Sequence, residues 1–449
     1  MLGGCEGLEP QLDTKMATPT SATRTSAALA TPEGIDAASM PGEVSDTRRL
    51  ALRNVLHAFI SSRLLIWAAG IATALIFGWA TNRGINLDPA GLTRPFPSEV
   101  PNVLISPAAR YDSAWYLSIA EGGYAGNLQT VFFPLYPATI ALVGLTGLPQ
   151  VVAGILLSCG FTIAALYLLH RLVELDFGLL EARNTVWIVA WLPVALFLSA
   201  VYSEALFLLL TVGSFYAGRL GRWWLAALLG ALAAATRNSG ILMVAPLLVL
   251  YLYGPRADRS PDGAGGGIGP RYKPRLDILW IALVPIGLIG FLAYLHWATG
   301  DPFAPFAFQA HWRRSFEPLA GIPLGFYAAY RSLTDVTFGI YPELPMRVIR
   351  HFGELAFLIS AGSLLWFGRR RLPAAYTALA ALSLAMTLSV PARGEPLKSL
   401  PRFTLVIFPL WIALALWAAE RRRVRMVLAV CAPLLVAWTF MFTGWHWAA

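Results

Sequence analysis

The sequence predicts an all-α integral membrane protein, a polytopic bundle of about eleven transmembrane helices with long outer loops. Its composition is the first reason: 57% of the 449 residues are hydrophobic and 13% are charged, against roughly 25% charged residues in soluble domains. The order of the residues is the second, because long apolar runs alternate with loops that carry Arg and Lys. This is the pattern of cytoplasmic loops, so the net charge of +9 indicates topology and not nucleic-acid binding.

Residues 1–47 precede the first apolar run and are rich in Ala, Thr, Ser and Pro. A segment without apolar periodicity buries too little surface to fold, so we expect a disordered cytoplasmic tail. No apolar stretch of the signal-peptide kind occurs in it, and Met16 or Met40 serve equally well as the start. Residues 48–449 form the predicted membrane domain.

Eleven apolar runs are candidate spans. They cover approximately residues 58–80, 151–172, 185–201, 205–217, 223–235, 240–253, 278–299, 352–367, 373–390, 403–419 and 424–443. Arg48, Arg49, Arg53 and Arg63 lie on the N-terminal side of the first run, which predicts a cytoplasmic N-terminus. The halves of residues 223–253 are short for separate crossings, but two crossings keep Arg219 and Arg222 inside. If residues 223–253 were one long kinked helix and the apolar run at 131–148 crossed the membrane, the loops between 131 and 253 would be inverted.

Alternate crossings place two long segments outside, residues 81–150 and residues 300–350. The turns at 202–204 and 236–239 and the loop 392–401 lie on the same face. Within the first outer loop, an apolar run at 131–148 is interrupted by Pro and Gly. Such a run indicates a membrane-dipping or juxtamembrane element and not a full crossing.

An acidic residue stands among aromatic residues in the first outer loop, in RYDSAWYLSIAEGGY (110–124), which FFPLYP (132–137) soon follows. Aromatic faces cover sugar rings, and partial burial raises the proton affinity of a carboxylate, as a general base requires. Asp112 is the candidate base. The candidate sugar-stacking residues are Tyr111, Trp115, Tyr116 and Phe133. An interfacial helix with a Trp and Tyr belt has the same pattern and stays open as an alternative.

These two motifs, with Tyr202-Ser203-Glu204, the turn at 235–240 and Gly300-Asp301-Pro302, resemble the PIG-V family of polytopic mannosyltransferases. More broadly they resemble the GT-C class of membrane glycosyltransferases. The resemblance covers roughly residues 50–309, and the C-terminal third is similar only in being hydrophobic. Tyr111 stands where the family commonly has Trp, which keeps an aromatic residue.

The resemblance implies a bundle of the GT-C type and an enzyme of a family that acts in glycosylphosphatidylinositol anchor biosynthesis. Mannose would pass from polyprenyl (dolichyl) phosphate mannose to a hydroxyl of a glycolipid or glycan on the extracytoplasmic face, with inversion. Asp112 would be the base. Asp301 makes no DxD pair and no metal-ligand cluster is visible, so we expect no metal and no cofactor besides the lipid-linked donor.

A leaving phosphate requires positive charge or hydrogen-bond donors near it. The candidates for contact with the donor phosphate or substrate are Arg110, Glu204, Arg237, Gln309, His311, Arg313, Arg314, Lys398 and Arg402. Arg237 lies between two apolar runs and requires a partner, for which Glu204 is suited. The pair equally suits a tie between two helices. The other arginines and Lys398 also suit anchors at lipid headgroups.

Three alternatives remain open from the sequence. A secondary transporter would use intramembrane charges and repeated halves, and no repeated halves are visible. A non-catalytic lipid-handling subunit would tolerate the loss of Asp112, and a transferase of the same class for another sugar would keep the fold. The Ala-, Gly- and Arg-rich composition favours a bacterial plasma membrane over the endoplasmic reticulum.

Overall fold

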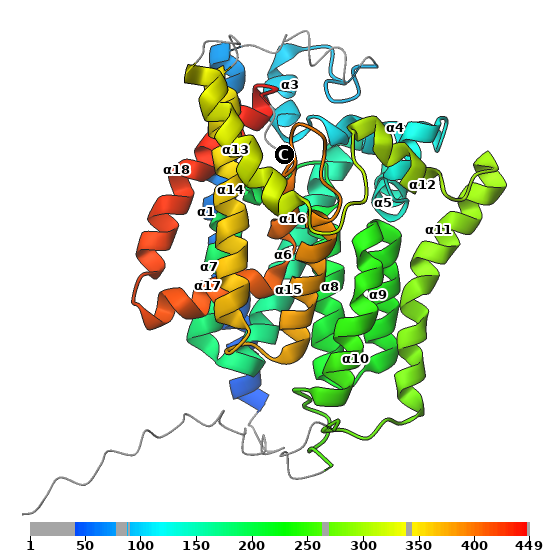
Figure 1. Cartoon of the computed structure of the whole chain (residues 1–449), viewed down its shortest axis with the longest axis vertical. Helices are drawn as coiled ribbons and strands as arrows, with labels where there is room; N and C mark the ends of the chain where they lie inside the picture. The colour runs from blue at the N-terminus through cyan, green and yellow to red at the C-terminus, as the bar shows by residue number, and fades with distance from the viewer. Residues whose placement is uncertain (1–40, 78–87, 89, 263–268, 338–343, 447–449) are drawn as a thin grey trace, which may run out of the picture. The chain divides into compact units, whose positions relative to one another are not determined.

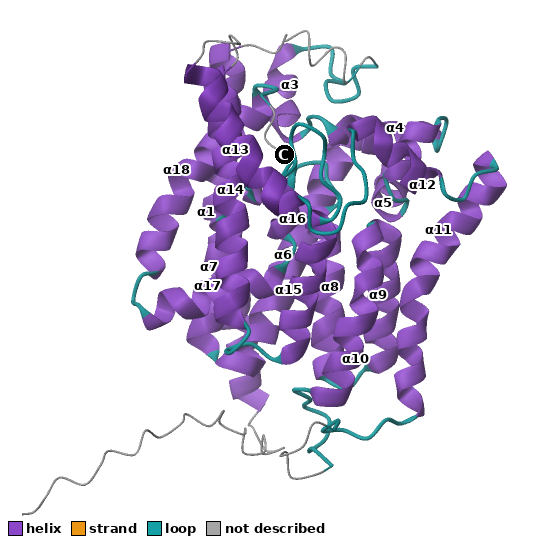
Figure 2. Cartoon of the chain, in the orientation of Figure 1, coloured by secondary structure: helices purple, strands orange, loops and turns teal. Residues whose placement is uncertain are grey.

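A computed structural model of the protein describes residues 41–77, 88, 90–262, 269–337 and 344–446. The chain divides into two units, residues 1–47 and residues 48–449. Regular structure throughout the described ranges is helical, and these ranges contain no strand (Figure 2). Most of the predicted tail lies outside the described residues.

The α-helices vary from four to 37 residues. They are α1 (Pro41–Phe77), α3 (Glu99–Ile105), α4 (Asp112–Gly122), α5 (Leu135–Gly144), α6 (Gln150–Phe177), α7 (Leu179–Trp191), α8 (Glu204–Arg219), α9 (Trp223–Thr236), α10 (Val244–Tyr253), α11 (Val284–Thr299), α12 (Ala304–Ala307), α13 (Gly321–Thr337), α14 (Leu344–Gly368), α15 (Ala374–Leu388), α16 (Leu400–Leu405), α17 (Phe408–Glu420) and α18 (Val424–Thr443). Short 3-10 helices are η1 (Ser106–Ala108), η2 (Asn127–Val131), η3 (Ala195–Leu198), η4 (Asn238–Met243), η5 (Leu276–Leu283) and η6 (Phe308–Trp312).

Five helical segments of the described chain are long and apolar enough to cross a membrane. They are Asp46–Phe77, Gln150–Phe177, Leu276–Thr299, Arg347–Gly368 and Val424–Thr443. A span needs about 20 apolar residues, and the other apolar helices are shorter. The prediction of an all-α, multi-pass membrane protein is therefore confirmed in this coarser form, while about eleven spans stays a prediction.

Helices α6, α7 and α8 form the centre of the unit, and most of α8 is buried. Large apolar side chains are exposed instead on α1, α11 and α18, for example Leu64, Ile289 and Val430. Helices α11 and α18 lie at opposite sides of the bundle in Figure 1. Exposed apolar surface of this kind is stable in a bilayer, because the lipid tails that cover it are as apolar as the side chains themselves.

Two predicted spans are interrupted. The run 185–201 contains α7, which ends at Trp191 before Leu192 and Pro193, and then η3. The run 403–419 is divided between α16 and α17, with Pro409 in the first turn of α17. Neither run is one continuous helix, because proline lacks an N–H and restricts the residue before it.

Residues 223–253 form two antiparallel segments, α9 and η4–α10, and not one kinked helix. The chain turns at Arg237, whose φ of −154° is extended, and η4 then packs back against α9. A Cβ atom on Gly240 would lie 2.3 Å from the carbonyl carbon of Ala233. Only glycine allows this close return, and the turn places Arg237 between the two segments.

Arg63 is a buried residue inside α1 and does not precede the span. Its Nη1 donates to the carbonyl oxygen of Ala195 at 2.8 Å and to Ser199 Oγ at 3.0 Å, and its Nη2 donates to the carbonyl oxygen of Ala190 at 3.1 Å. These carbonyls lie where α7 ends and η3 begins. Arg63 therefore satisfies backbone acceptors at this helix break, which removes it from the positive charges that predict topology.

The short helices gather at one end of the bundle. Figure 1 shows α4, α5, α12 and α16 together above the ends of α6, α8, α9 and α15. Helix α4 contacts α5 and α6, and α16 contacts α14 and α15. The 131–148 run contributes only α5, which has 10 residues and is too short to cross a bilayer. Segments far apart in the sequence thus meet at this end.

Candidate active site

Asp112 is the first residue of α4 and follows a strained turn. Tyr111 has a φ of 51°, a region that aromatic residues rarely adopt. The hydroxyl of buried Tyr202 donates to the carbonyl oxygen of Arg110 at 3.1 Å and accepts from the backbone N–H of Asp112 at 3.3 Å. Tyr202 thereby supports both sides of the turn, and strain maintained in this way is typical of functional sites.

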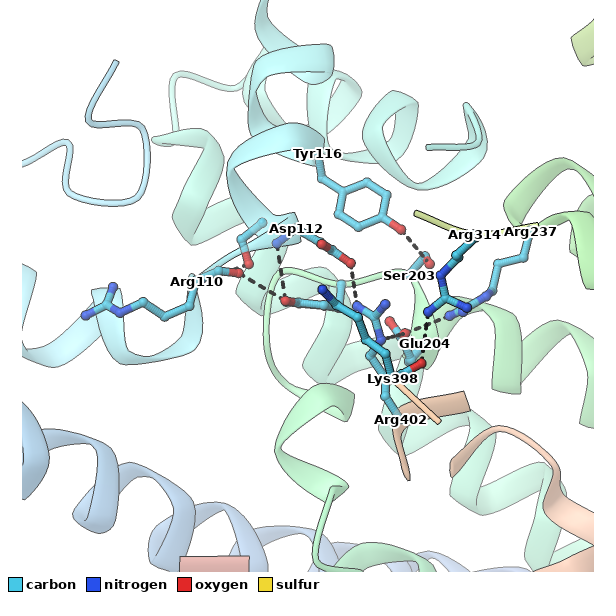
Figure 3. Close-up of polar contacts among 11 residues, drawn as sticks. Arg110, Asp112, Tyr116, Ser203, Glu204, Arg237, Arg314, Lys398 and Arg402 are labelled. Carbon is cyan, nitrogen blue, oxygen red and sulfur yellow. Dashed lines mark hydrogen bonds and ion pairs between the residues drawn. The ribbon is translucent and has the colours of Figure 1, made fainter. Parts of the chain in front are cut away.

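Four side chains of alternating charge form a series across the site, which we name the charge chain: Asp112, Arg402, Glu204 and Arg237 (Figure 3). Arg402 Nη1 donates to Asp112 Oδ2 at 2.5 Å, and Arg402 Nε lies 3.4 Å from Glu204 Oε1. Arg237 Nη1 donates to the same Glu204 oxygen at 2.6 Å. The predicted pairing of Arg237 with Glu204 is present, but Glu204 also serves Arg402.

The ion pairs of the charge chain are strong because several of the charged groups are buried. The side chain of Glu204 is 1% exposed, and its Oε2 is buried without a hydrogen-bond partner. Burial alone would lower the pKa of Arg402, but the carboxylates of Asp112 and Glu204 outweigh it and raise that pKa above its ordinary value. Arg402 is therefore cationic at any physiological pH. A buried charge without such a partner would cost several kcal/mol.

The phenyl ring of Phe403 lies among three guanidinium groups. The Cζ atoms of Arg237 and Arg402 are each 5.1 Å from the ring centroid, and that of Arg314 is 5.7 Å away. An aromatic face attracts each cation, but three like charges so close together repel one another. A negatively charged ligand would relieve this repulsion.

A cavity of about 470 Å³, the site cavity, opens beside the charge chain. Its charged lining residues are Asp112, Glu204, Arg237, Arg314, Lys398 and Arg402. Four cations thus face two carboxylates, an excess of two positive charges. The site cavity also has an apolar part, lined by Phe207, Leu379, Met386, Val406 and Ile407. Charged groups and apolar surface in one cavity suit an amphiphilic anion.

Aromatic side chains from the first outer loop line the side of the site cavity nearest α4. They are Tyr116, Phe132 and Phe133, and Trp312 of η6 joins them. Tyr116 is fixed by a 2.9 Å hydrogen bond between its hydroxyl and Ser203 Oγ, and burial raises its pKa. Its hydroxyl is consequently neutral and able both to donate and to accept.

Nine of the residues predicted for the site line the site cavity. They are Asp112, Tyr116, Phe133, Glu204, Arg237, Gln309, Arg314, Lys398 and Arg402. Five lie outside its lining: Arg110, Tyr111, Trp115, His311 and Arg313. His311 and Arg313 are exposed, and the ring of Trp115 stacks on Phe132 at 5.8 Å.

Arg110 and Tyr111 point away from the charge chain. The guanidinium of Arg110 donates to the carbonyl oxygens of Ser106, Ala109 and Thr443, and Figure 3 shows it directed away from Arg402. Burial, followed by the charge of Arg94, lowers the pKa of Arg110 to about 9. The ring of Tyr111 packs against Trp445, 5.0 Å away. Both residues fasten α4 to the C-terminal end of α18.

Arg314 and Lys398 belong to contacts that hold the loop before α16. Arg314 donates to the carbonyl oxygens of Val390 at 3.0 Å and Lys398 at 2.9 Å. Burial lowers the pKa of Arg314 to about 10, so it stays charged at neutral pH. Lys398 Nζ lies 3.5 Å from Glu395, which pairs with Arg350 at 2.5 Å. Segment 389–403 is thereby held by Arg314 and by the ion pairs of Glu395.

Some lining residues escaped sequence reasoning. Phe403 directly follows a predicted cation, and Phe132 belongs to the FFPLYP motif, so a signal was present for both. Leu379, Ser383, Met386 and Thr387 of α15 have no signal in the sequence, because they belong to an ordinary apolar helix.

The model of the family described as Mannosyltransferase (PIG-V) matches residues 52–253. The rat (Rattus norvegicus) protein named GPI alpha-1,6-mannosyltransferase 2 is 33% identical over 158 residues, which cover 32% of each chain. The human (Homo sapiens) protein of the same name is 31% identical over 165 residues, 34% of this chain and 33% of its own length. The chain therefore aligns with about a third of these relatives.

These matches confirm the resemblance to PIG-V mannosyltransferases over residues 52–253, and they support the prediction of an enzyme of the glycosyltransferase kind. Asp112, Glu204 and Arg237 lie within the matched residues, whereas Arg314, Lys398 and Arg402 lie beyond them. A crystal structure of an Archaeoglobus fulgidus oligosaccharyltransferase with zinc and sulfate has 12% identity and a TM-score of 0.36, over 71% of this chain and 44% of that chain. A TM-score this low does not establish a shared fold.

Proposed function

Because residues 52–253 resemble PIG-V mannosyltransferases, we propose that the protein transfers mannose from a polyprenyl (dolichyl) phosphate-linked donor to a hydroxyl of a glycolipid or glycan. Asp112 is the general base of this reaction, which inverts the anomeric carbon. One observation carries the proposal: a single cavity holds the Asp112 carboxylate, an excess of two positive charges and an apolar part.

The charge excess supports a donor with a phosphate. A polyprenyl phosphate is an anion on an apolar chain, so its phosphate suits the cations of the site cavity and its chain suits the surface formed by Leu379, Met386 and Val406. Charge-assisted hydrogen bonds to phosphate are the strong ones. A sugar nucleotide would instead need a polar cleft for its base and ribose.

The chemistry is a single displacement. The acceptor hydroxyl oxygen attacks the anomeric carbon of mannose from the side opposite the phosphate, and the new C–O bond forms as the bond to the phosphate oxygen breaks. The hydroxyl proton passes to Asp112, and the bonding electron pair leaves with the polyprenyl phosphate. This leaving group needs no proton, so one carboxylate is enough, and nearby cations stabilise its developing charge.

Only one of the two Asp112 carboxylate oxygens accepts a hydrogen bond from a described residue. Arg402 occupies Oδ2 of Asp112, and no described residue donates to Oδ1. The Asp112 side chain is 20% exposed and lines the site cavity, so an acceptor hydroxyl has access to it. The aromatic side chains of Tyr116, Phe132 and Phe133 offer surfaces for a sugar ring on the same side.

We place this end of the bundle on the extracytoplasmic face and the N-terminus in the cytoplasm, in a bacterial plasma membrane. The basic loops support this orientation, because alternate crossings from a cytoplasmic N-terminus put Arg222 and Arg369–Arg371 in inside loops. A lipid-linked donor is suited to an outer face, where nucleotide sugars are absent.

Transfer of labelled mannose from synthetic polyprenyl phosphate mannose tests the proposal. Membranes with the wild-type chain should incorporate label into endogenous acceptor, and Asp112→Asn should lose about 100- to 10,000-fold in rate at equal protein level. Glu121→Gln is the matched control, because Glu121 is an exposed residue of the same helix and should keep full activity.

The outcomes separate the proposal from a transferase of another sugar and, with an uptake assay, from a transporter. Equal transfer by wild type and Asp112→Asn would remove Asp112 as the base. Transfer from a glucose or aminoarabinose donor alone would keep the enzyme class and change the sugar. No transfer from any donor, together with uptake of a labelled solute into vesicles, would favour a transporter.

A further inference from the structure

We propose that the two arginines bound to Glu204 have different tasks: Arg402 positions the Asp112 carboxylate, and Arg237 binds the phosphate of the donor. This division rests on the proposed function and deepens it. Both arginines line the site cavity, and their residue type alone does not distinguish them. The carboxylates that each arginine contacts do distinguish them.

Arg402 stands between two carboxylates. Its Nη1 donates to Asp112 Oδ2 at 2.5 Å, and its Nε lies 3.4 Å from Glu204 Oε1. The Cζ atom is 5.2 Å from the ring centroid of Tyr202, the residue whose hydroxyl also accepts from the Asp112 backbone. A phosphate at Arg402 would be repelled by both carboxylates, so this site favours a positioning role.

Arg237 has one carboxylate partner. Only its Nη1 contacts Glu204, and no described residue accepts from its Nε or Nη2. Its side chain is 17% exposed, compared with 11% for Arg402. The adjacent lining residues Asn238 and Ser239 are neutral and polar. A phosphate oxygen beside Arg237 would therefore meet a cation and hydrogen-bond donors, with a single carboxylate behind them.

Glu204 holds both arginines through one carboxylate oxygen. Its Oε1 serves both of them, and its Oε2 is buried without a partner. A carboxylate that is 1% exposed cannot turn toward water, so it holds both guanidinium groups in place. This arrangement fixes the distance between the base and the phosphate-binding cation before the donor arrives, which is how positioning lowers a barrier.

The experiment separates turnover from donor affinity. For Arg402→Gln we expect kcat to fall by about 10- to 100-fold, with the KM for polyprenyl phosphate mannose within about threefold of wild type. For Arg237→Gln we expect the donor KM to rise by about tenfold or more, as for the loss of a charged hydrogen bond. Arg402→Lys, which keeps a cation, should recover part of the lost kcat.

Binding of polyprenyl phosphate, the released product, gives a second readout that needs no turnover. Its Kd for the purified protein should be unchanged in Arg402→Gln and raised about tenfold or more in Arg237→Gln. Arg393→Gln is the matched control, because Arg393 is an exposed residue of segment 389–403 outside the site cavity. If Arg402→Gln fails to fold, Arg402→Lys should still show a kcat below that of wild type, with an unchanged Kd.

Two results would overturn the division of tasks. Equal weakening of product binding by both glutamine variants would mean that the two arginines share the phosphate. A higher Kd in Arg402→Gln with an unchanged Kd in Arg237→Gln would reverse their tasks. A wild-type protein that neither binds polyprenyl phosphate nor transfers mannose would instead contradict the proposed function itself.

Discussion

The first outer loop and segment 389–403 contribute opposite charges to the same cavity, and they are built differently. Asp112 begins a regular helix, α4, after a turn that Tyr202 supports. Arg402 lies in α16, a helix of six residues that ends before α17 begins. Segment 389–403 depends on Arg314 and on the pairs of Glu395 for its position. The proposed base thus sits at the start of a regular helix, whereas Lys398 and Arg402 sit on a segment that is held by side-chain contacts.

The two regions also differ in their likeness to known proteins. The PIG-V model includes Asp112, Glu204 and Arg237 but ends at residue 253, before Arg314, Lys398 and Arg402. Within the described residues, however, Arg402 makes the shortest contact to the Asp112 side chain. The proposed base therefore has its closest side-chain partner in a region that similarity alone does not identify. The most informative variants are those that remove contacts between the two regions.

Loss of Glu204 should have the largest effect, because this residue joins both regions. Glu204→Ala leaves Arg237 and Arg402 without their shared carboxylate in a buried place. We expect a loss of about 3–5 kcal/mol in the free energy of unfolding, measured by thermal or denaturant unfolding in detergent. Glu121→Ala is the control. Equal stability of the two variants would show that the arginines find other partners.

Arg314→Gln should weaken the segment that carries Arg402. Both backbone carbonyls that Arg314 contacts would lose a charged donor, so we expect a loss of about 1.5–3 kcal/mol in unfolding free energy. Arg313→Gln, at the neighbouring exposed position, should change stability by less than about 0.5 kcal/mol. Similar losses in the two variants would show that segment 389–403 does not depend on Arg314.

Tyr202→Phe should have a smaller effect, in the region of the base. The missing hydroxyl leaves the Arg110 carbonyl and the Asp112 N–H without this partner. We expect a loss of about 1 kcal/mol in unfolding free energy and a decrease in kcat on the order of tenfold, because the base is less well positioned. Tyr216→Phe on α8 removes a hydroxyl outside the site cavity. If Tyr216→Phe lowered kcat as much as Tyr202→Phe, the effect would come from a general loss of structure and not from the position of Asp112.

Removal of divalent ions should have the smallest effect. In the proposed reaction the cations of the site cavity balance the leaving phosphate, so EDTA should leave the mannose transfer rate within experimental error. Loss of activity with EDTA that Mg²⁺ or Mn²⁺ restores would contradict metal independence and would require a metal at the donor phosphate.

The sequence predicts the features that depend on local pattern. The apolar runs predict the helical membrane fold, and the acidic residue within an aromatic motif indicates Asp112. The Arg237 and Glu204 pair follows from the cost of an unpaired charge between apolar runs. Pro193 and Pro409 mark the two helix breaks in the sequence. A mean hydropathy over the whole apolar run does not register a single proline, so the breaks are not predicted.

The contacts between distant segments do not follow from local pattern. Asp112 and Arg402 are separated by 290 positions, and several arginines of the sequence were equally suited to a phosphate. Arg110 stands two residues from the base but points to α18, because the carbonyls of Ser106, Ala109 and Thr443 accept from it. Tertiary packing therefore decides which arginine meets the carboxylate.

The most direct test of the central claim compares Asp112→Asn with Glu121→Gln in the purified protein, with polyprenyl phosphate mannose and an acceptor glycolipid. We predict that wild type and Glu121→Gln release one polyprenyl phosphate for each mannosylated acceptor, and that Asp112→Asn forms both products at least about 100-fold more slowly. Asp112→Asn at the wild-type rate, with equal protein and equal stability, would contradict the assignment of Asp112 as the base.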